Sequence, residues 1–436
     1  VIGFDMGGTS TDVSHYSGAF ERTSDSVVAG VRLRAPMLAV HTVAAGGGSI
    51  CRFDGARLRV GPESAGAVPG PAAYRRGGPL TVTDCNVMLG KLRPEFFPPV
   101  FGPGADQPLD ADAVRDGFKA LAAEVLAATG RTMTPVELAE GFLAIAVQDM
   151  AEAIKAISIQ RGHDVSGYVL NSFGGAGGQH ACMVADALGM TRVMLHPLAG
   201  VLSAYGMGLA AVRTIREETI AVPLESGQIA LLDRRATALG AVAHAELVAQ
   251  DIAFDSVETL VRARIKYDGT DTPLTVAFDT VAAMRESFES LHRRRFGFVA
   301  TDKILIVESL EAEATGRSGS AGPAAAAPVA ATVPPPIPAA RIRMAGADQT
   351  ATIVRREGLV AGSVIDGPAI VLEQTGTTVI EPGWQGTTDA ALNLILERVA
   401  PLAPRRAVGT EADPILLEVF NSRFMAVAEQ MGEALR

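Results

Sequence analysis

The sequence predicts an α/β fold followed by a small, mainly-β carboxyl-terminal domain. Short β-branched runs alternate with glycine clusters up to about Leu92, helical periodicity follows from Ala111, and short strands with turn signals return beyond residue 340. At 436 residues the chain exceeds the size that one hydrophobic core usually serves. We therefore expect two or three folded units.

The first region is predicted to consist of strands and tight loops. Strands are expected at Val1–Asp5, Thr42–Val43 and Leu80–Thr83, close to glycine-containing turns. The chain opens directly on a strand pattern and its first residue is not Met. We interpret it as a chain cut from a longer one.

Two amphipathic helices are marked in the middle of the chain. Ala111–Thr129 repeats apolar residues at three-and-four spacing, and Thr134-Pro135-Val136-Glu137 is a capping box that begins a helix reaching about Gln160. A strand at Tyr168–Phe173, a glycine-rich turn and a helix at Gln179–Leu188 follow. Strand, glycine turn and helix in this order are typical of a nucleotide-contacting corner in an α/β fold.

The rest of the chain divides into further parts. Residues 1–212 form the first, and residues 213–312 continue the α/β pattern with elements near Leu231–Ile252, Thr259–Tyr267, Leu274–Phe278 and Val281–Phe296. An Ala/Pro-rich linker is expected over residues 313–340.

The carboxyl-terminal part is predicted to be a small β domain at residues 341–400. A second linker at residues 401–412 leads to residues 413–436, where an apolar stripe on a helix from Pro414 needs a partner. The strands of the small domain are expected at Ala351–Arg355, Ala369–Leu372, Thr377–Ile380 and Leu392–Leu396.

Composition excludes several classes of function. The net charge of −10 and the scattered arginines argue against a nucleic-acid partner, and no apolar run approaches the length of a membrane span. The three cysteines lie far apart, which favours a reducing, cytoplasmic compartment. The histidines form neither an HxxxH pattern nor a Cys/His zinc spacing, so we predict no structural zinc site among His15, His41, His163, His196, His244 and His292.

The strongest local motif is a predicted hairpin at the start of the chain. Its glycines let the backbone approach a ligand, and its amides and hydroxyls can turn toward phosphate oxygens, while two aspartates lie near enough to hold Mg²⁺ through water. A plain tight hairpin with polar turn residues is the alternative. The candidate phosphate ligands are Gly7, Gly8, Thr9, Ser10 and Thr11, and the candidate metal ligands are Asp5 and Asp12.

A second glycine cluster lies between the strand at 168–173 and the following helix. Little side-chain bulk remains there, so a flat ring or a ribose can pack against the backbone of Gly174, Gly175, Ala176, Gly177 and Gly178. Close packing of strand on helix is the alternative. His180 either reaches a ligand from the first helical turn or is a surface or capping histidine.

A third cluster joins a Gly/Pro-rich loop at Gly61–Pro71 to the segment Thr81–Asn86. Glu63, Asp84 and Asn86 are candidate oxygen ligands for a metal or for polar substrate groups, and solvated turn carboxylates are the alternative. Ala44–Ser49 is either another loop on the phosphate side or a hinge.

Taken in order between Gly3 and Gly208, these motifs resemble the hydantoinase A half of 5-oxoprolinases and N-methylhydantoinases. The run Gly174–Cys182 is similar to the 5-oxoprolinase version. Asp366–Ile370 and Pro382–Trp384 are similar to the β unit that closes hydantoinase A, and Asp413–Val419 looks like the opening of the hydantoinase B half. Two departures, Ala73 in place of Cys and Cys85 in place of Ala, make an essential thiol at either position doubtful.

The resemblance implies part of an actin/Hsp70/sugar-kinase-like ATPase domain and the ATP-dependent hydrolysis of 5-oxo-L-proline to L-glutamate, with ATP and Mg²⁺. Phosphoryl activation of the lactam carbonyl would use Asp5, Asp12, Glu63 and Asp84 as catalytic groups, with Gly174–Gly178 along the adenosine. The expected partners are the small-molecule lactam and two parts of the same enzyme that this chain is expected to lack, the amino-terminal segment and the hydantoinase B half. A homo-oligomer is also expected.

The resemblance leaves two alternatives open. One is an N-methylhydantoinase or an acetone-carboxylase-type subunit, which would phosphorylate a different carbonyl compound. The other is a nucleotide-dependent scaffold or regulatory ATPase, because fold analogy alone does not fix function. If the amino-terminal segment and the B half are both required, this chain alone is expected to be inactive.

Overall fold

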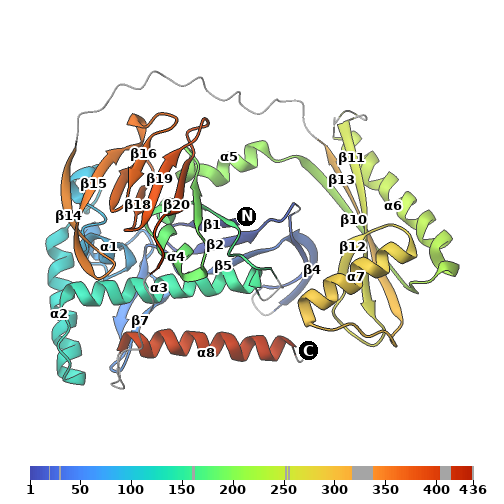
Figure 1. Ribbon diagram of the computed structural model, residues 1–436, viewed down its shortest axis with the longest axis horizontal. Coiled ribbons are helices and arrows are strands. Elements are labelled where there is room, and N and C mark those ends of the chain that lie inside the picture. The colour runs from blue at the N-terminus through green and yellow to red at the C-terminus, as the bar shows by residue number, and fades with distance from the viewer. Residues whose placement is uncertain are drawn as a thin grey trace. The chain divides into compact units, whose positions relative to one another are not determined.

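The computed structural model describes residues 1–18, 20–28, 31–159, 163–250, 253, 256–316, 337–402 and 414–434. The chain divides into two compact units, one made of Val1–Tyr205 with Ala327–Arg436 and the other of Gly206–Ala326 (Figure 1). The second unit is therefore inserted into the sequence of the first.

The first unit is built on an eight-stranded mixed sheet with the order β16-β19-β20-β9-β8-β1-β2-β5. Burial alternates along β1, because successive side chains point to opposite faces: Ile2, Phe4 and Met6 are fully buried, whereas Gly3 and Asp5 face the other side. β1 pairs antiparallel with β2 and parallel with β8. The bounds are β1 Ile2–Met6, β2 Thr11–His15, β5 Val40–Val43, β8 Val169–Phe173, β9 Arg192–Leu195, β16 Val364–Asp366, β19 Trp384–Thr388 and β20 Leu394–Arg398.

Helices cover the buried face of this sheet. α3 (Pro135–Ile157) contacts β2 and β5, and it begins at the predicted capping box of Thr134 and Glu137. α2 (Ala111–Thr129) has the predicted bounds and ends at Gly130 in the left-handed conformation. α4 (Ala181–Leu188) follows β8 after the short 3-10 helix η4 (Gly177–Gln179), so the predicted order of strand, glycine turn and helix is confirmed.

The segment Leu80–Thr83, predicted as a strand, is instead the start of helix α1 (Val82–Met88). Thr81 caps this helix, and Asp84 returns a bond to the Thr81 backbone. The β-branched residues misled the prediction, although Thr81 and Asp84 stand at capping-box spacing. Two antiparallel hairpins, β3–β4 and β6–β7, complete the amino-terminal part: β3 Arg22–Val28, β4 Val31–Leu38, β6 Ser49–Phe53 and β7 Leu58–Ser64.

The carboxyl-terminal strands do not form one sheet of their own. β14 (Ile337–Met344), β15 (Ala347–Arg355), β17 (Ala369–Leu372) and β18 (Thr377–Ile380) make a four-stranded sheet, but β16, β19 and β20 join the main sheet through the pairing of β20 with β9. Trp384 is buried in the same core as Phe4. Residues predicted as a separate domain therefore complete the first unit.

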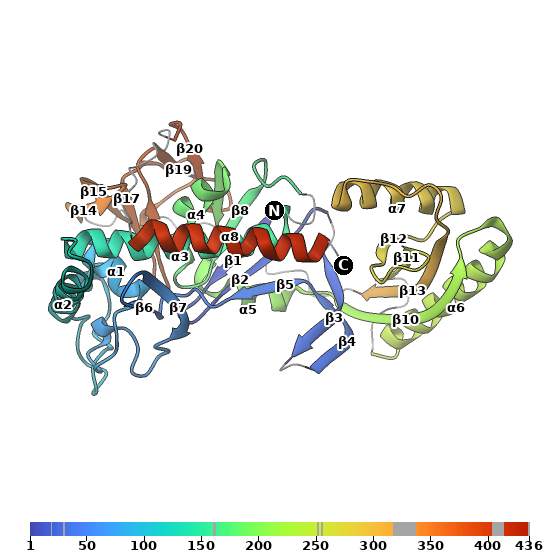
Figure 2. The same ribbon diagram turned by 90° about the horizontal axis from the view of Figure 1, so that it is seen from below.

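Helix α8 (Pro414–Ala434) lies along α3 (Figure 2). Ser422 Oγ donates to Asp149 Oδ1 at 3.3 Å, and Arg57 Nη1 lies 3.0 Å from Glu418 Oε2. The predicted stripe finds a partner only in part, because Phe424 is 72% and Met431 63% exposed.

The second unit has its own antiparallel sheet, in the order β10-β13-β11-β12, with two helices. Its core contains Leu232 of one helix, Phe288 of the other and Ile265 of the sheet. β10 and β13 were not expected from the sequence. The bounds are α5 Leu202–Leu209, which crosses the boundary between the units, β10 Val212–Pro223, α6 Ile229–Val248, β11 Val257–Tyr267, β12 Leu274–Ala277, α7 Val281–Phe296 and β13 Leu305–Gly316.

Most of the two predicted linkers, residues 317–336 and 403–413, lies outside the described residues. The range predicted for the first linker was too long at both ends, since β13 extends to Gly316 and β14 begins at Ile337. Within the described part of the chain, no helix combines the length and the apolar character that a membrane crossing requires.

Candidate active site

The predicted phosphate hairpin is a tight turn that a second glycine loop supports. Gly7 N–H donates to Ser10 O at 3.0 Å, and Gly47 N–H donates to Gly7 O at 3.1 Å. A Cβ on Gly46 would lie 2.6 Å from Ser10 N, so only glycine permits this backbone-to-backbone contact. Ala44–Ser49 thus contains a loop that packs against the predicted phosphate hairpin, and its part in phosphate binding stays a prediction.

This turn borders a cavity of about 570 Å³ in the first unit. Gly7, Gly8 and Gly47 form one side, and Gly175 with Ala176 forms another. The structure therefore brings together the two glycine motifs that are far apart in the sequence. An apolar wall completes the cavity with Tyr74, Phe96, Phe97, Val100 and Phe101.

Asp5 and Asp12 stand directly opposite each other on β1 and β2. Residues paired in this way project to the same face of a sheet with Cβ atoms roughly 5 Å apart. Asp5 Oδ2 accepts from Ser203 Oγ at 2.7 Å, and Asp12 Oδ1 accepts from Thr42 Oγ1 at 2.5 Å. Two carboxylates opposite each other repel, so the pair suits a cation. Both residues flank the turn, whose Gly7 and Gly8 line the cavity.

The five residues of the second glycine motif have different surroundings. Gly175 and Ala176 line the cavity. Gly174 has φ of +79°, and a Cβ there would lie 2.4 Å from Asp5 Oδ1. Cβ atoms on Gly177 and Gly178 would lie 2.9 Å from Ser172 Oγ and 2.6 Å from Thr378 Oγ1. Close packing therefore accounts for Gly174, Gly177 and Gly178. Gly175 lines the cavity, where a Cβ would be in ordinary contact with Thr375 O at 3.5 Å.

The carboxyl-terminal part contributes lining residues that the sequence reasoning missed. Thr375 and Gly376 between β17 and β18, and Thr377 at the start of β18, line the cavity next to Gly175. A Cβ on Gly200 would lie 2.0 Å from Thr375 Oγ1, which explains why glycine occupies position 200. In the sequence, the one indication of this segment was Gly376, a turn residue between two predicted strands.

Asp84 is fully buried and holds backbone in place. Its Oδ1 accepts from Ala73 N at 2.8 Å, and its Oδ2 accepts from Ala72 N at 3.0 Å and from both Thr81 N and Oγ1. Burial raises the pKa of Asp84 to about 6, although these hydrogen bonds oppose the rise. The neighbouring Thr83 lines the cavity, and its N–H donates to Gly47 O at 2.8 Å.

Glu63 lies at the end of β7 and pairs with Arg52 at 2.9 Å, with about half of each side chain exposed. Its own backbone N–H and Arg52 lower the pKa of this carboxyl. Among the described residues that line the cavity, Glu63 and Asp84 do not occur. Of the other predicted site residues, Asp5, Asp12, Thr9, Ser10 and Thr11 are also absent from the described lining, so only the glycines of the turn reach the cavity.

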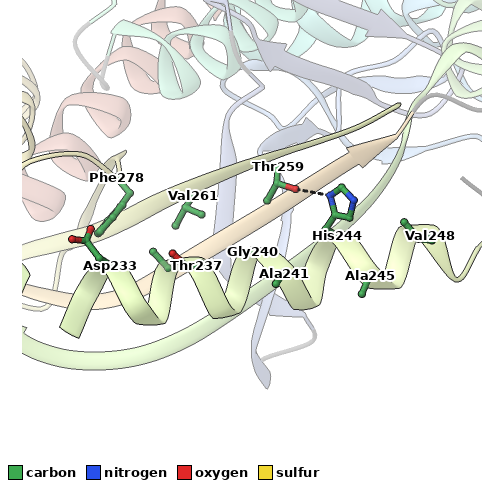
Figure 3. A pocket seen from close by; sticks show the side chains of 11 residues that line it. Asp233, Thr237, Gly240, Ala241, His244, Ala245, Val248, Thr259, Val261 and Phe278 are labelled. Atoms are coloured by element: carbon green, nitrogen blue, oxygen red, sulfur yellow. Dashed lines mark hydrogen bonds between the residues drawn. The ribbon is translucent and has the colours of Figure 1, made fainter. Parts of the chain in front are cut away.

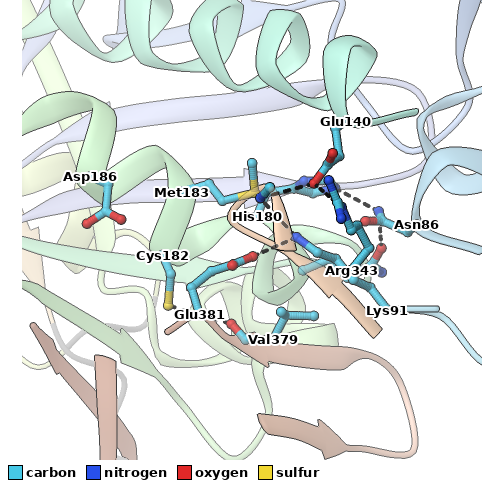
Figure 4. Close-up of polar contacts among 12 residues, drawn as sticks. Asn86, Lys91, Glu140, His180, Cys182, Met183, Asp186, Arg343, Val379 and Glu381 are labelled. Atoms are coloured by element: carbon cyan, nitrogen blue, oxygen red, sulfur yellow. Dashed lines mark hydrogen bonds and ion pairs between the residues drawn. The ribbon is translucent and has the colours of Figure 1, made fainter. Parts of the chain in front are cut away.

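Behind the cavity lies a buried polar cluster of Asn86, Gln179, His180, Lys91 and Glu381 (Figure 4). Asn86 Nδ2 donates to Gln179 Oε1 at 2.9 Å and lies 3.2 Å from His180 Nε2. Burial, and then the charge of Lys91, lower the pKa of His180 to about 3, so this histidine is neutral. Gln179 lines the cavity, whereas His180 is only 1% exposed and packs behind it.

Lys91 and Glu381 form an ion pair at 2.6 Å with side chains that are 3% and 8% exposed. The pair joins the end of α1 to the end of β18, and so ties the carboxyl-terminal part to the cavity wall. The three cysteines are free and buried; Cys182 Sγ lies 3.6 Å from Val379 O, and burial raises its pKa.

A second cavity, of about 690 Å³, lies in the second unit between α6 and its sheet (Figure 3). His244 Nδ1 lies 3.4 Å from Thr259 Oγ1 at this cavity, and Val261 and Phe278 are among its apolar lining. None of the described residues that line it comes from the predicted motifs. The smaller cavity of the first unit is therefore the candidate active site.

Comparison with known proteins finds relatives of the part of the chain that contains the two glycine motifs. Residues 1–216 match the sequence model described as Hydantoinase/oxoprolinase. This part of the chain belongs to the hydantoinase/oxoprolinase family. The whole chain is 38% identical to 5-oxoprolinase of Saccharomyces cerevisiae and 36% identical to 5-oxoprolinase 1 of Arabidopsis thaliana, in each case over all of its length. It spans 35% of the length of these curated relatives.

The fold is shared with two solved structures. The crystal structure of ATP-dependent caprolactamase from Pseudomonas jessenii matches with a TM-score of 0.78 and 28% identity, over 91% of this chain and 58% of that one. Nucleotide-free acetone carboxylase matches over the same shares with a TM-score of 0.65 and 23% identity, which bears on the fold alone. The predicted α/β, actin/Hsp70/sugar-kinase-like fold is confirmed.

Proposed function

We propose that the protein to which this chain belongs couples ATP to the hydrolysis of a cyclic amide, with 5-oxo-L-proline as the substrate and L-glutamate as the product. The observation that carries the proposal is the meeting of the Gly7–Gly8 turn and the Gly175–Ala176 turn at one cavity. The identity to two 5-oxoprolinases along the whole chain supports this substrate.

The chemistry requires activation of a poor electrophile. Transfer of the γ-phosphoryl group from ATP to the lactam carbonyl oxygen releases ADP and leaves a carbon that water can attack. Phosphoryl transfer depends mainly on positioning and on charge neutralisation. Gly8, Thr9 and Ser10 at the tip of the turn suit the phosphates. Gly7 N–H donates to Ser10 O, and Thr11 is fully buried with Oγ1 donating to Ala45 O, so these two predicted ligands shape the turn instead. The apolar wall with Phe97 keeps bulk water from the carbonyl.

Asp5 and Asp12 fit a divalent cation, because their carboxylates share one face of the sheet at directly opposite positions. Mg²⁺ prefers carboxylate oxygens and retains several waters. Bound there, it would neutralise charge on the phosphates. Ser203 and Thr42, which donate to Asp5 and Asp12, would hold the two carboxylates in orientation.

For the remaining predicted residues we propose narrower roles. Gly175 and Ala176 contact the nucleotide, while Gly174, Gly177 and Gly178 shape the turn. Asp84 positions the segment of Thr83 and the loop of Ala72 and Ala73, a role that its four hydrogen bonds support. The carboxylate of Glu63 pairs with Arg52 rather than facing the cavity, so a contact between Glu63 and the substrate stays a prediction.

The further partners follow from the length of the relatives. Curated 5-oxoprolinases are nearly three times as long as this chain, which spans 35% of them. We propose that the exposed stripe of α8, with Phe420 and Phe424, packs against a following hydantoinase B half. A cytoplasmic location and a homo-oligomer belong to the same proposal.

The deciding experiment measures ATP turnover by the complete protein with and without 5-oxoproline, together with glutamate. We expect ADP and glutamate to form in step and only when the lactam is present. ATP consumption that is equal without the lactam, with no glutamate, would instead indicate a scaffold or regulatory ATPase. Because caprolactamase shares the fold, caprolactam and N-methylhydantoin serve as competing substrates, and preference for either would overturn the choice of 5-oxoproline.

A further inference from the structure

Two histidines and a glutamate gather away from the candidate active site. His15 is the last residue of β2, Glu21 follows the bridge between Tyr16 and Phe20, and His163 lies in the segment between α3 and β8. We propose that His15, Glu21 and His163 form a binding site for one divalent transition metal, with Zn²⁺ as the ion that fits best.

The distances suit a shared ion. The candidate ligand atoms of the three residues all lie within 4.8 Å of one another. His163 Nε2 lies 3.3 Å from Glu21 Oε1, close to the roughly 3.3 Å that separates two ligands of a tetrahedral zinc with bonds near 2.1 Å. His15 Nδ1 lies 2.5 Å from the same oxygen, so a small rotation of the glutamate opens the space for the ion.

Tyr168 supplies the outer contact that such a site needs. Its hydroxyl lies 3.3 Å from His15 Nε2, the ring nitrogen that does not face Glu21. In the metal-free neutral imidazole, Nδ1–H donates to Glu21 and the Tyr168 hydroxyl donates to Nε2. With zinc on Nδ1, the proton resides on Nε2, and this N–H donates a hydrogen bond to the Tyr168 hydroxyl oxygen. The second ring nitrogen of a metal-bound histidine is commonly held in this way.

Burial and ligand chemistry favour a transition metal over Mg²⁺. The side chains of His15, His163 and Glu21 are 1%, 13% and 22% exposed, so the cluster is shielded but has an open edge. Two imidazoles and one carboxylate suit Zn²⁺, whereas Mg²⁺ prefers oxygen ligands. His15 also points to the buried face of β2, opposite to Asp12, so the two cation sites are separate.

This inference reverses the prediction of no zinc site, which rested on local spacing. The two histidines lie in distant segments and come together only because α3 returns the chain to the end of β2. An ion there would tie the end of β2 to the segment that leads into β8. Metal binding would therefore stabilise the sheet that carries the candidate active site.

The test is a calorimetric titration of the chelator-treated protein with ZnCl₂ in excess Mg²⁺. We expect one equivalent of Zn²⁺ to bind and to raise the melting temperature by several degrees. His163→Ala and Glu21→Gln should each weaken binding by at least about 100-fold, and Tyr168→Phe by about 10-fold. The side chains of Glu21 and His163 are partly exposed, so their substitution should leave the fold intact. Melting curves without zinc verify that each variant folds.

Matched variants distinguish this site from others. His41→Ala removes an exposed histidine and Asp12→Asn alters the proposed Mg²⁺ site, and both should bind Zn²⁺ as the unaltered protein does. Absence of zinc binding by the unaltered protein, or equal binding by His163→Ala and Glu21→Gln, would overturn the proposal. The result is independent of whether 5-oxoproline proves to be the substrate.

Discussion

At the scale of single residues, the motifs predicted from sequence divide into those that face the cavity and those that pack behind it. Gly7, Gly8 and Gly175 line the cavity, whereas Gly178 and His180 support it from behind. Residue type and spacing identified all of them. They could not separate the two groups, because a glycine beside a ligand and a glycine beside a side chain look the same in sequence.

In the complete protein, Asp12→Asn is expected to lower ATP turnover by roughly 100-fold or more, since it removes a charged ligand of the proposed Mg²⁺ site. Its effect on folding should be small, because the amide oxygen still accepts from Thr42 Oγ1 and repulsion with Asp5 is relieved. Steady-state kinetics and thermal melting measure the two effects. Asp116→Asn, at an exposed position on α2, is the control; an unchanged rate in Asp12→Asn would remove Asp12 from the metal site.

Gly178→Ala is expected to destabilise the protein by about 1–3 kcal/mol, as overpacked positions do. The added Cβ would lie 2.6 Å from Thr378 Oγ1 and 3.0 Å from the Thr377 carbonyl oxygen, and the latter is backbone. Denaturant unfolding measures the loss. Gly206→Ala, where a Cβ meets nothing within 4 Å, should cost nothing. Equal stability of the two variants would show that the turn is not tightly packed.

At the scale of elements, periodicity and capping predicted helices better than strands. The bounds of α2 and α7 agree with the prediction, and the capping box of Thr134 begins α3. The long strands β10 and β13 were missed, because charged residues such as Glu311 and Glu313 interrupt their apolar pattern. Arg262 pairs with both of these glutamates across the sheet, a compensation that only the pairing of strands reveals.

The packing of α8 on α3 is expected to depend on pH through Asp149. Burial, and repulsion by Glu418 and Glu152, raise the pKa of Asp149 to about 7. The folded protein therefore holds this proton more tightly than the unfolded chain, so stability falls as pH rises from about 4 to about 7. Asp149→Asn should remove that part of the pH dependence and raise the melting temperature above pH 7.

Melting curves of both proteins between pH 4 and pH 8 check this expectation, with Asp116→Asn as the exposed control. The quantity to compare is the difference between variant and unaltered protein at each pH, which removes the titration of other groups. A difference that stays constant over the range would contradict the assignment.

At the scale of the whole molecule, the division into two units agrees with the hydrophobic cores, because among the described residues no core combines buried residues of both units. The cores around Leu232 and around Ala243 contain residues of the second unit alone. Strands β16, β19 and β20 and one face of β17 and β18, by contrast, share one core with β1 and α3. Strands β14 and β15 pack with the other face of β17 and β18 in a separate core of the first unit. Sequence length indicated two or three units, but it could not show that the second is inserted into the first.

Residues 206–326 expressed alone are therefore expected to fold, with one cooperative thermal transition and mixed α/β circular dichroism. The physical reason is that this segment buries its own apolar side chains, including Met284 and Phe288, without help from the first unit. Circular dichroism during heating is the measurement. A broad, non-cooperative loss of signal would mean that the unit depends on the rest of the chain.

The sequence by itself determined the α/β class, the bounds of α2 and α7 and the two glycine motifs, because periodicity, capping and backbone freedom are local properties. Only the tertiary structure decided which residues meet. It placed Thr375–Thr377 next to Gly175, buried Asp84 among hydrogen bonds from Ala72, Ala73 and Thr81, and joined β20 to β9. Contacts between distant segments depend on how strands pair and helices pack, and a linear pattern does not contain that information.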